Sequence, residues 1–169
     1  MKTNTRIDAL VHWRPDFDSD QPLFEPLCPL LSSFRNFTQW PGLAAYQELL
    51  DNAATPLRTQ HGATLKIVAQ EGKPNHFEQH YAPRIYLHGE IQTRTENWHD
   101  FFQLLTWFIF PRTKAVINAI HIPRAKQRID AGEVGRRSPV ENMLSLFDEG
   151  GVVITSCEPE LLQLVRDFK

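Results

Sequence analysis

The 169-residue chain has few of the features that mark the commoner special classes of protein. Its two cysteines, Cys28 and Cys157, form no CxxC or Cys/His pattern, so we expect no disulfide framework and a reducing compartment. No stretch approaches the roughly 20 apolar residues of a membrane-spanning helix. Residues 1–10 have no apolar core, so no signal peptide is expected. We therefore predict a soluble, cytoplasmic protein with no membrane partner.

Excess charge and common catalytic motifs are also missing. The formal net charge is only -2, which gives no general attraction to nucleic acid. A basic run at 124–137 is interrupted by Asp130 and Glu133, and a solvated helix end explains it at least as well as a phosphate site. Nucleic-acid binding therefore ranks last. The sequence contains no GxSxG, GxGxxG, P-loop or HExxH motif, which leaves the common serine hydrolases and nucleotide-binding proteins without support.

Proline and aromatic residues are concentrated in residues 1–41. Five prolines between 15 and 41 exclude long regular elements there. Six aromatic residues between 13 and 40 are too many for a disordered segment. We predict an irregular N-terminal arm that lies on the domain through its aromatic side chains, with a short helix near 27–34. This arm is also the surface through which a protein partner would bind.

The remaining residues, 42–169, are predicted to form a helix-rich α+β body with a small sheet, so that 1–169 is a single domain. Periodicity and β-branched content predict strands at 65–70, 84–92 and 152–155, the first two able to pair. A turn is expected at 148–151. Apolar spacing, N-cap residues and prolines predict helices at 42–52, 98–110, 112–121, 138–147 and 158–168, with Pro123 closing the third.

The most informative segment is 97–121, because it places polar residues at fixed spacing inside an apolar stretch. Lys114, Asn118 and His121 stand at i, i+4 and i+7 and therefore share one face of a helix. Pro111 separates this helix from the one before it. If the chain folds back on itself at Pro111, residues at similar distances on either side of the corner converge.

His99 and Asp100 lie about as far before that corner as His121 lies after it. A convergent set of His, Asp and amide groups can act as a base with its orienting partner or bind a divalent ion such as zinc. Each residue also has a plain structural explanation as a helix cap, a dipole partner or part of a solvated face. The predicted catalytic residues are His99, Asp100 and Asn118, the substrate-binding residues Arg94, Arg112 and Lys114, and the ligands of a divalent metal His99, Asp100 and His121.

Two functions are compatible with this pattern. The first is a hydrolase-like activity, with or without a metal ion, in which the basic residues bind an anionic substrate. The alternative is a non-catalytic binding or protein-interaction module, in which the polar residues are hydrogen-bonded inside the fold. The residues alone do not decide between them.

Three short motifs carry a family resemblance. They are NWHDFF at 97–102, FPRTK at 110–114 and LFDEG at 146–150. Together they resemble the signature of an uncharacterised bacterial family, the domain of unknown function family 3025, most strongly over 84–151. The resemblance implies no reaction. It implies that the family-typical polar residues here are Arg94, His99, Asp100, Arg112, Lys114, Asn118, Asp148 and Glu149.

The chain departs from that family pattern in two places. Gln103 stands where the family has Asn, and Val140-Glu141-Asn142 stands where Arg-Asp-Ala is usual. The resemblance also implies continuation beyond residue 169, so we expect a C-terminal portion to be absent.

Overall fold

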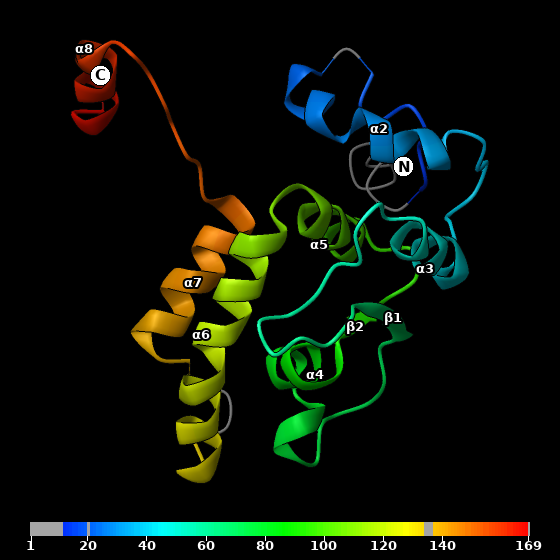
Figure 1. Ribbon diagram of the computed structural model, residues 1–169, viewed down its shortest axis with the longest axis vertical. Coiled ribbons are helices and arrows are strands. Elements are labelled where there is room, and N and C mark those ends of the chain that lie inside the picture. The colour runs from blue at the N-terminus through cyan, green and yellow to red at the C-terminus, as the bar shows by residue number, and fades with distance from the viewer. Residues whose placement is uncertain (1–11, 20, 134–136, 169) are drawn as a thin grey trace, which may run out of the picture. The chain divides into compact units, whose positions relative to one another are not determined.

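The computed structural model describes residues 12–19, 21–133 and 137–168 (Figure 1). The chain divides into two compact units, a larger one that ends at residue 136 and a smaller one that begins at Arg137. The fold is the predicted helix-rich α+β class with one small sheet. The assignment of the whole chain to a single domain stays a prediction.

The described part of the N-terminal arm is built from short helical turns and irregular chain. Its elements are η1 (Pro22–Leu27), α2 (Cys28–Leu31) and η2 (Ser32–Phe34), which confirms the predicted short helix near 27–34. Trp13 stacks on Trp98 with ring centroids 5.2 Å apart, and its indole N–H donates to the Phe37 carbonyl at 2.9 Å. The aromatic side chains of the arm therefore pack against the body rather than facing solvent.

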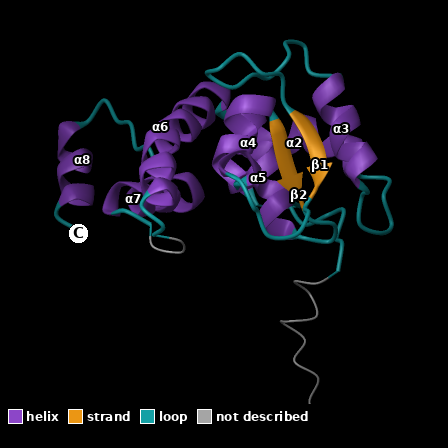
Figure 2. Ribbon diagram, turned by 90° about the horizontal axis from the view of Figure 1, so that it is seen from below, coloured by secondary structure: helices purple, strands orange, loops and turns teal. Residues whose placement is uncertain are grey.

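The sheet is a two-stranded parallel pair joined through a helix. After α3 (Leu43–Asp51), β1 (Lys66–Ala69) pairs with β2 (Glu90–Thr93), and η3 (Phe77–Gln79) and α4 (Tyr81–His88) form the connection between them. Parallel strands need such a crossover, because a tight turn can join only antiparallel ones. Figure 2 shows both strands side by side, with α3 beside β1 and α4 beside β2.

The predicted strand at 84–92 is wrong over its first half. Residues 84–88 belong to α4, and only 90–93 form a strand. The alternation of Ile85 and Leu87 suggested a strand. Ile85 is buried, but it belongs to a helix. Gly89 separates the two elements: its φ of 71° is left-handed, and its N–H donates to the Ile85 carbonyl at 2.8 Å, which ends the helix.

The two long helices meet at the predicted proline corner. Helix α5 (Trp98–Ile109) begins as expected, with the Asn97 side chain accepting a hydrogen bond from the Asp100 backbone N–H at 3.0 Å. Helix α6 (Pro111–Asp130) does not end before Pro123, so that prediction is wrong. A proline removes only one backbone donor, and Ala125, two residues further on, is buried, so packing holds the helix in place beyond Pro123.

The core is centred on α5. Four of its side chains, at 101, 104, 105 and 107, are almost fully buried. Phe34 from the arm and Tyr46 from α3 pack around Phe101 with ring centroids 5.3 and 5.7 Å away. Helix α6 packs mainly against α4. The arm, α3, β2 and α6 therefore surround α5.

The smaller unit contains α7 (Pro139–Gly150) and α8 (Pro159–Arg166). Helix α7 starts with the predicted capping box, in which Ser138 and Glu141 exchange hydrogen bonds. Two other predictions for this unit are wrong: residues 148–150 belong to α7 rather than to a turn, and 152–155 form no strand. A segment with high β-propensity forms a strand only where its context allows it to pair. Among the described residues, no strand pairs with 152–155. The predicted last helix is confirmed.

Candidate functional site

Asp100, in the first turn of α5, is bonded to two other predicted site residues, Arg94 and His99. Its carboxylate accepts from the Arg94 backbone N–H at 2.8 Å and from the Arg94 guanidinium at 2.8 and 2.9 Å. The Nδ1 atom of His99 lies 3.0 Å from the same carboxylate. Both Arg94 and the first turn of α5 flank the connection from β2, so these bonds fix that connection.

The charges in this cluster are mutually stabilising. Burial alone would raise the pKa of the Asp100 carboxyl, but hydrogen bonds from Arg94 and His99 outweigh it, and the pKa is lowered. The hydrogen bond to Asp100 raises the pKa of the Arg94 guanidinium in turn. Burial, with a smaller contribution from the Asp100 charge, raises the pKa of the Tyr46 hydroxyl. At neutral pH the cluster is therefore an ion pair beside a neutral tyrosine.

The His99–Asp100 contact has the form of a base with its orienting carboxylate. The His99 side chain is half exposed, so its ring is accessible. However, Arg94 uses three of the hydrogen bonds that the carboxylate accepts, which is the pattern of a structural ion pair. The structure thus brings together three predicted residues, Arg94, His99 and Asp100. Their bonds account for the local backbone conformation, and a structural role is sufficient to explain them.

Lys114 and Asn118 connect α6 to its neighbours. The ammonium of Lys114 donates to the Gln103 side-chain oxygen of α5 at 2.6 Å and lies 5.8 Å from the centre of the Trp107 ring. The Asn118 amide donates to the Ala82 carbonyl of α4 at 2.9 Å. Its own side-chain oxygen is buried and has no hydrogen-bond partner among the described residues. Both side chains are less than one-tenth exposed and join helices together.

The metal centre predicted at His99, Asp100 and His121 stays a prediction that the described residues do not support. Among residues 12–19, 21–133 and 137–168, no three His, Cys, Asp or Glu side chains form a group that could hold a metal ion, so His99, Asp100 and His121 are not such a set. Helix α6 contacts α4 more extensively than it contacts α5. The Asp100 oxygens are also occupied by Arg94.

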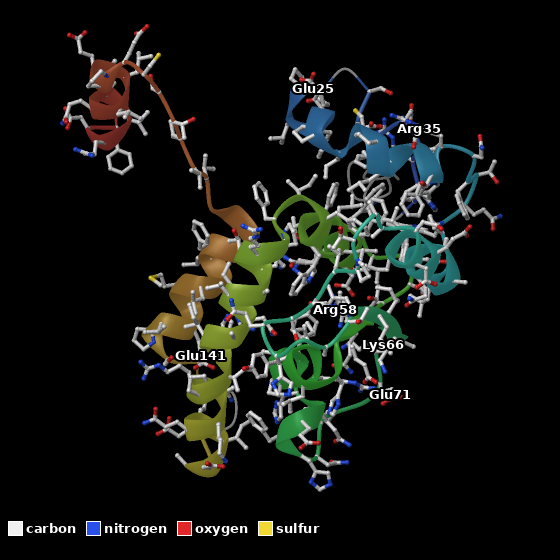
Figure 3. The ribbon with its side chains drawn as sticks, in the orientation of Figure 1. Glu25, Arg35, Arg58, Lys66, Glu71 and Glu141 are labelled. Atoms are coloured by element: carbon white, nitrogen blue, oxygen red, sulfur yellow. The ribbon has the colours of Figure 1, made fainter. Side chains whose placement is uncertain are left out.

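Arg112, the last of the predicted binding residues, lies in a different place. It is exposed at the second position of α6 and forms no ion pair with any described residue. With Arg58, labelled in Figure 3, it lines an open groove of about 500 Å³ between the 55–60 loop and the first turns of α6. The walls of this groove, hereafter the α6 groove, are Thr55, Pro56, Leu57, Arg58, Thr59, Gln60, Pro111, Arg112, Ala115 and Val116.

Sequence reasoning missed the α6 groove. Its two sides are more than 50 residues apart in the chain, and no local spacing pattern links them. Arg112 was the only signal available in advance. Sequence reasoning also missed an ion-pair network on the sheet, where Glu90 accepts from Arg84 and Lys66, and Arg84 also contacts Glu71. Burial opposes ionisation of Glu90, but its two basic partners lower the pKa of that carboxyl.

Comparison with known families agrees with the sequence motifs. The family model described as "Protein of unknown function (DUF3025)" matches residues 65–169. The chain belongs to this family. No curated protein and no solved structure gives a match. The DUF3025 match begins immediately before β1 and includes α4 to α8, whereas the arm, α3 and the 55–60 loop precede it.

Within the DUF3025 region, three of the polar residues that the resemblance singled out have contacts that join elements of the larger unit. Asp100 binds Arg94, Lys114 binds Gln103, and Asn118 binds the Ala82 carbonyl. Gln103, which departs from the expected Asn, still accepts from Lys114, so the substitution preserves the link between α5 and α6. In the described part of this DUF3025 chain, no helix has the length and apolar content required to cross a membrane.

Proposed function

We propose that this protein is a non-catalytic protein-interaction module that binds its partner through helix α8. The observation that carries the proposal is an apolar stripe on α8: Leu161, Leu164 and Val165 follow i, i+3, i+4 spacing, and each is 45–49 % exposed. This spacing places all three on one face of the helix. No residue of α8 is buried.

Exposed apolar side chains also occur on either side of α8. Phe168, seven positions after Leu161, is 99 % exposed, and Val152, Val153 and Ile154 in the preceding segment are 50–79 % exposed. Single exposed apolar residues are normal, but several on one face of a helix are typical of an interaction surface. An amphipathic helix that lays such anchors into an apolar groove is a recurring mode of protein recognition.

The charges of α8 favour a protein partner over a lipid surface. Glu158, Glu160 and Asp167 outnumber Arg166, so the polar face is acidic. Helices that lie on membranes usually carry Lys and Arg on that face, because biological membranes are anionic. The partner expected for α8 therefore has an apolar groove with basic groups along it.

The contacts at the α5–α6 corner support a binding role over a hydrolase-like one. Asp100, Lys114 and Asn118, three residues expected at an active site, are bonded to other parts of the fold. The N-terminal arm is a weaker candidate for the contact surface, because its Trp13 and Phe34 are buried in the core. Helix α8 has no such internal role in the smaller unit.

Site-specific photocrosslinking in cells of the native host tests the proposal. A benzoyl-phenylalanine side chain at position 164 lies on the stripe, whereas the same group at position 163 lies on the opposite face and serves as the matched control. We expect a covalent adduct with a protein from position 164, several-fold stronger than from 163 and abolished by Leu161→Asp. Equal yields from the two positions, or no adduct at 164, would refute an interaction through the stripe.

A further inference from the structure

We propose that the partner of α8 is a second copy of this chain, and that the α6 groove of one copy receives α8 of the other. This inference rests on the proposed function and names its partner. It is carried by a match in chemistry between two surfaces that lie in different units of the chain.

The α6 groove has the character that α8 requires. Its walls include the apolar side chains of Pro56, Leu57 and Val116, and Val116 is 42 % exposed. Arg58 and Arg112 are both exposed in the same lining. The Arg58 guanidinium donates to the Gly62 carbonyl at 2.8 Å, which leaves its remaining N–H groups for a ligand. Arg112 forms no ion pair with any residue that the structure describes.

Helix α8 presents the complementary pattern. Glu160 and Asp167, spaced i and i+7, lie along the flank of the stripe next to Leu164. Seven residues of helix span about 10 Å, so the two carboxylates stand one behind the other along the apolar edge. An apolar stripe flanked by two acids therefore meets an apolar groove that contains two arginines. Opposite charges in these positions fix the orientation of the helix in the groove.

Two features favour a dimer in which each copy binds the other: the reach of the linker before α8 and the small area that a single α8 helix buries in the α6 groove. Residues 151–158 connect α7 to α8 without regular structure, and eight extended residues reach at most about 29 Å. One eight-residue helix buries less than the roughly 800 Å² per partner of a stable interface. Exchange of α8 in both directions provides two such contacts. It also closes the assembly as a two-fold dimer, the commonest form of homo-oligomer.

Charge exchange combined with mass measurement tests the inference. The full chain is examined by sedimentation equilibrium, where a dimer has twice the 19.6 kDa mass of the chain. We expect Arg58→Glu with Arg112→Glu, and separately Glu160→Arg with Asp167→Arg, to weaken dimerisation at least about tenfold, the effect of one lost charge pair. The chain carrying all four substitutions should recover affinity to within about threefold of the original. Gln163→Lys, on the opposite face of α8, is the control and should leave the dimer unchanged.

The outcomes separate this inference from the function on which it rests. A chain that stays monomeric at high concentration, or a dimer that ignores both charge reversals, overturns self-recognition. If position 164 nevertheless forms an adduct with a different protein in cells, α8 is still an interaction helix and only the identity of its partner is wrong. If position 164 forms no adduct, the proposed function fails as well. Circular dichroism of each variant confirms that these exposed substitutions leave the fold intact.

Discussion

Replacing Gly89 with alanine should destabilise the larger unit much more than a surface glycine normally does. Gly89 has a φ of +71°, and a β-carbon built there would lie 2.0 Å from the Thr64 backbone carbonyl oxygen. The neighbouring backbone cannot simply move away, because the Gly89 carbonyl accepts from the Lys66 N–H at 2.8 Å where β1 begins. The substitution therefore strains the residue and also displaces the sheet.

The magnitude has two parts. A left-handed conformation costs a non-glycine residue about 1–2 kcal/mol. An extra methyl group that forces a backbone shift costs about 1–3 kcal/mol. The free energy of unfolding should therefore fall by about 2–5 kcal/mol, reduced slightly because alanine also restricts the unfolded chain.

Urea denaturation followed by tryptophan fluorescence measures this loss. The matched control is Gly62→Ala, since Gly62 has a φ of +92° but nothing lies within 4 Å of its β-carbon position. The control should lose only the conformational part, about 1–2 kcal/mol. If the two variants are equally stable, the close approach to Thr64 contributes nothing and the proposed geometry of the α4–β2 joint is wrong.

Three further substitutions test other contacts. The Asp100 carboxyl has a lowered pKa in the folded chain, so its contribution to the free energy of unfolding is present above the unfolded-state pKa and is lost as pH falls through the folded-state pKa. Urea denaturation should therefore show that the original chain loses more stability between about pH 5 and pH 2 than Asp100→Asn does. The same loss in both chains would contradict this. Asn118→Ala should cost about 1–3 kcal/mol in thermal unfolding, because the Ala82 carbonyl loses its donor; an unchanged melting temperature argues against that bond. Ser138→Ala removes the N-cap of α7 and should cost about 1 kcal/mol, seen as faster amide hydrogen exchange in the first turn of α7; unaltered exchange there would mean that the cap is not formed.

Local signals predicted the helices well where a cap was present. Asn97 and Ser138 marked the starts of α5 and α7 correctly, because capping depends on residues within one turn. The errors arose where local patterns are ambiguous. Gly89 is compatible with both a helix end and a bulge in a strand. Pro123 would end a helix only if packing did not hold the residues beyond it, and the buried Ala125 shows that packing does hold them.

The candidate site was less predictable, because it depends on how elements pack. The predicted break between the two helices at Pro111 is present, and Lys114 of α6 donates a hydrogen bond to Gln103 of α5 across it. The direction of α6 beyond that point is set by α4, to which Asn118 is bonded, and no spacing within 97–121 encodes this. The α6 groove depends on the 55–60 loop in the same way.

The stacking of Trp13 on Trp98 has a spectroscopic consequence. The two indole planes are inclined by only 14° at a centroid separation of 5.2 Å, which is close enough for their electronic transitions to couple. Such coupling produces a paired positive and negative band in the ultraviolet circular dichroism spectrum. Trp13 belongs to the arm and Trp98 to α5, so the contribution of this pair to the spectrum is lost when the arm detaches, even if the helices remain. The chain thus has an intrinsic, label-free optical indicator of whether its N-terminal arm is seated.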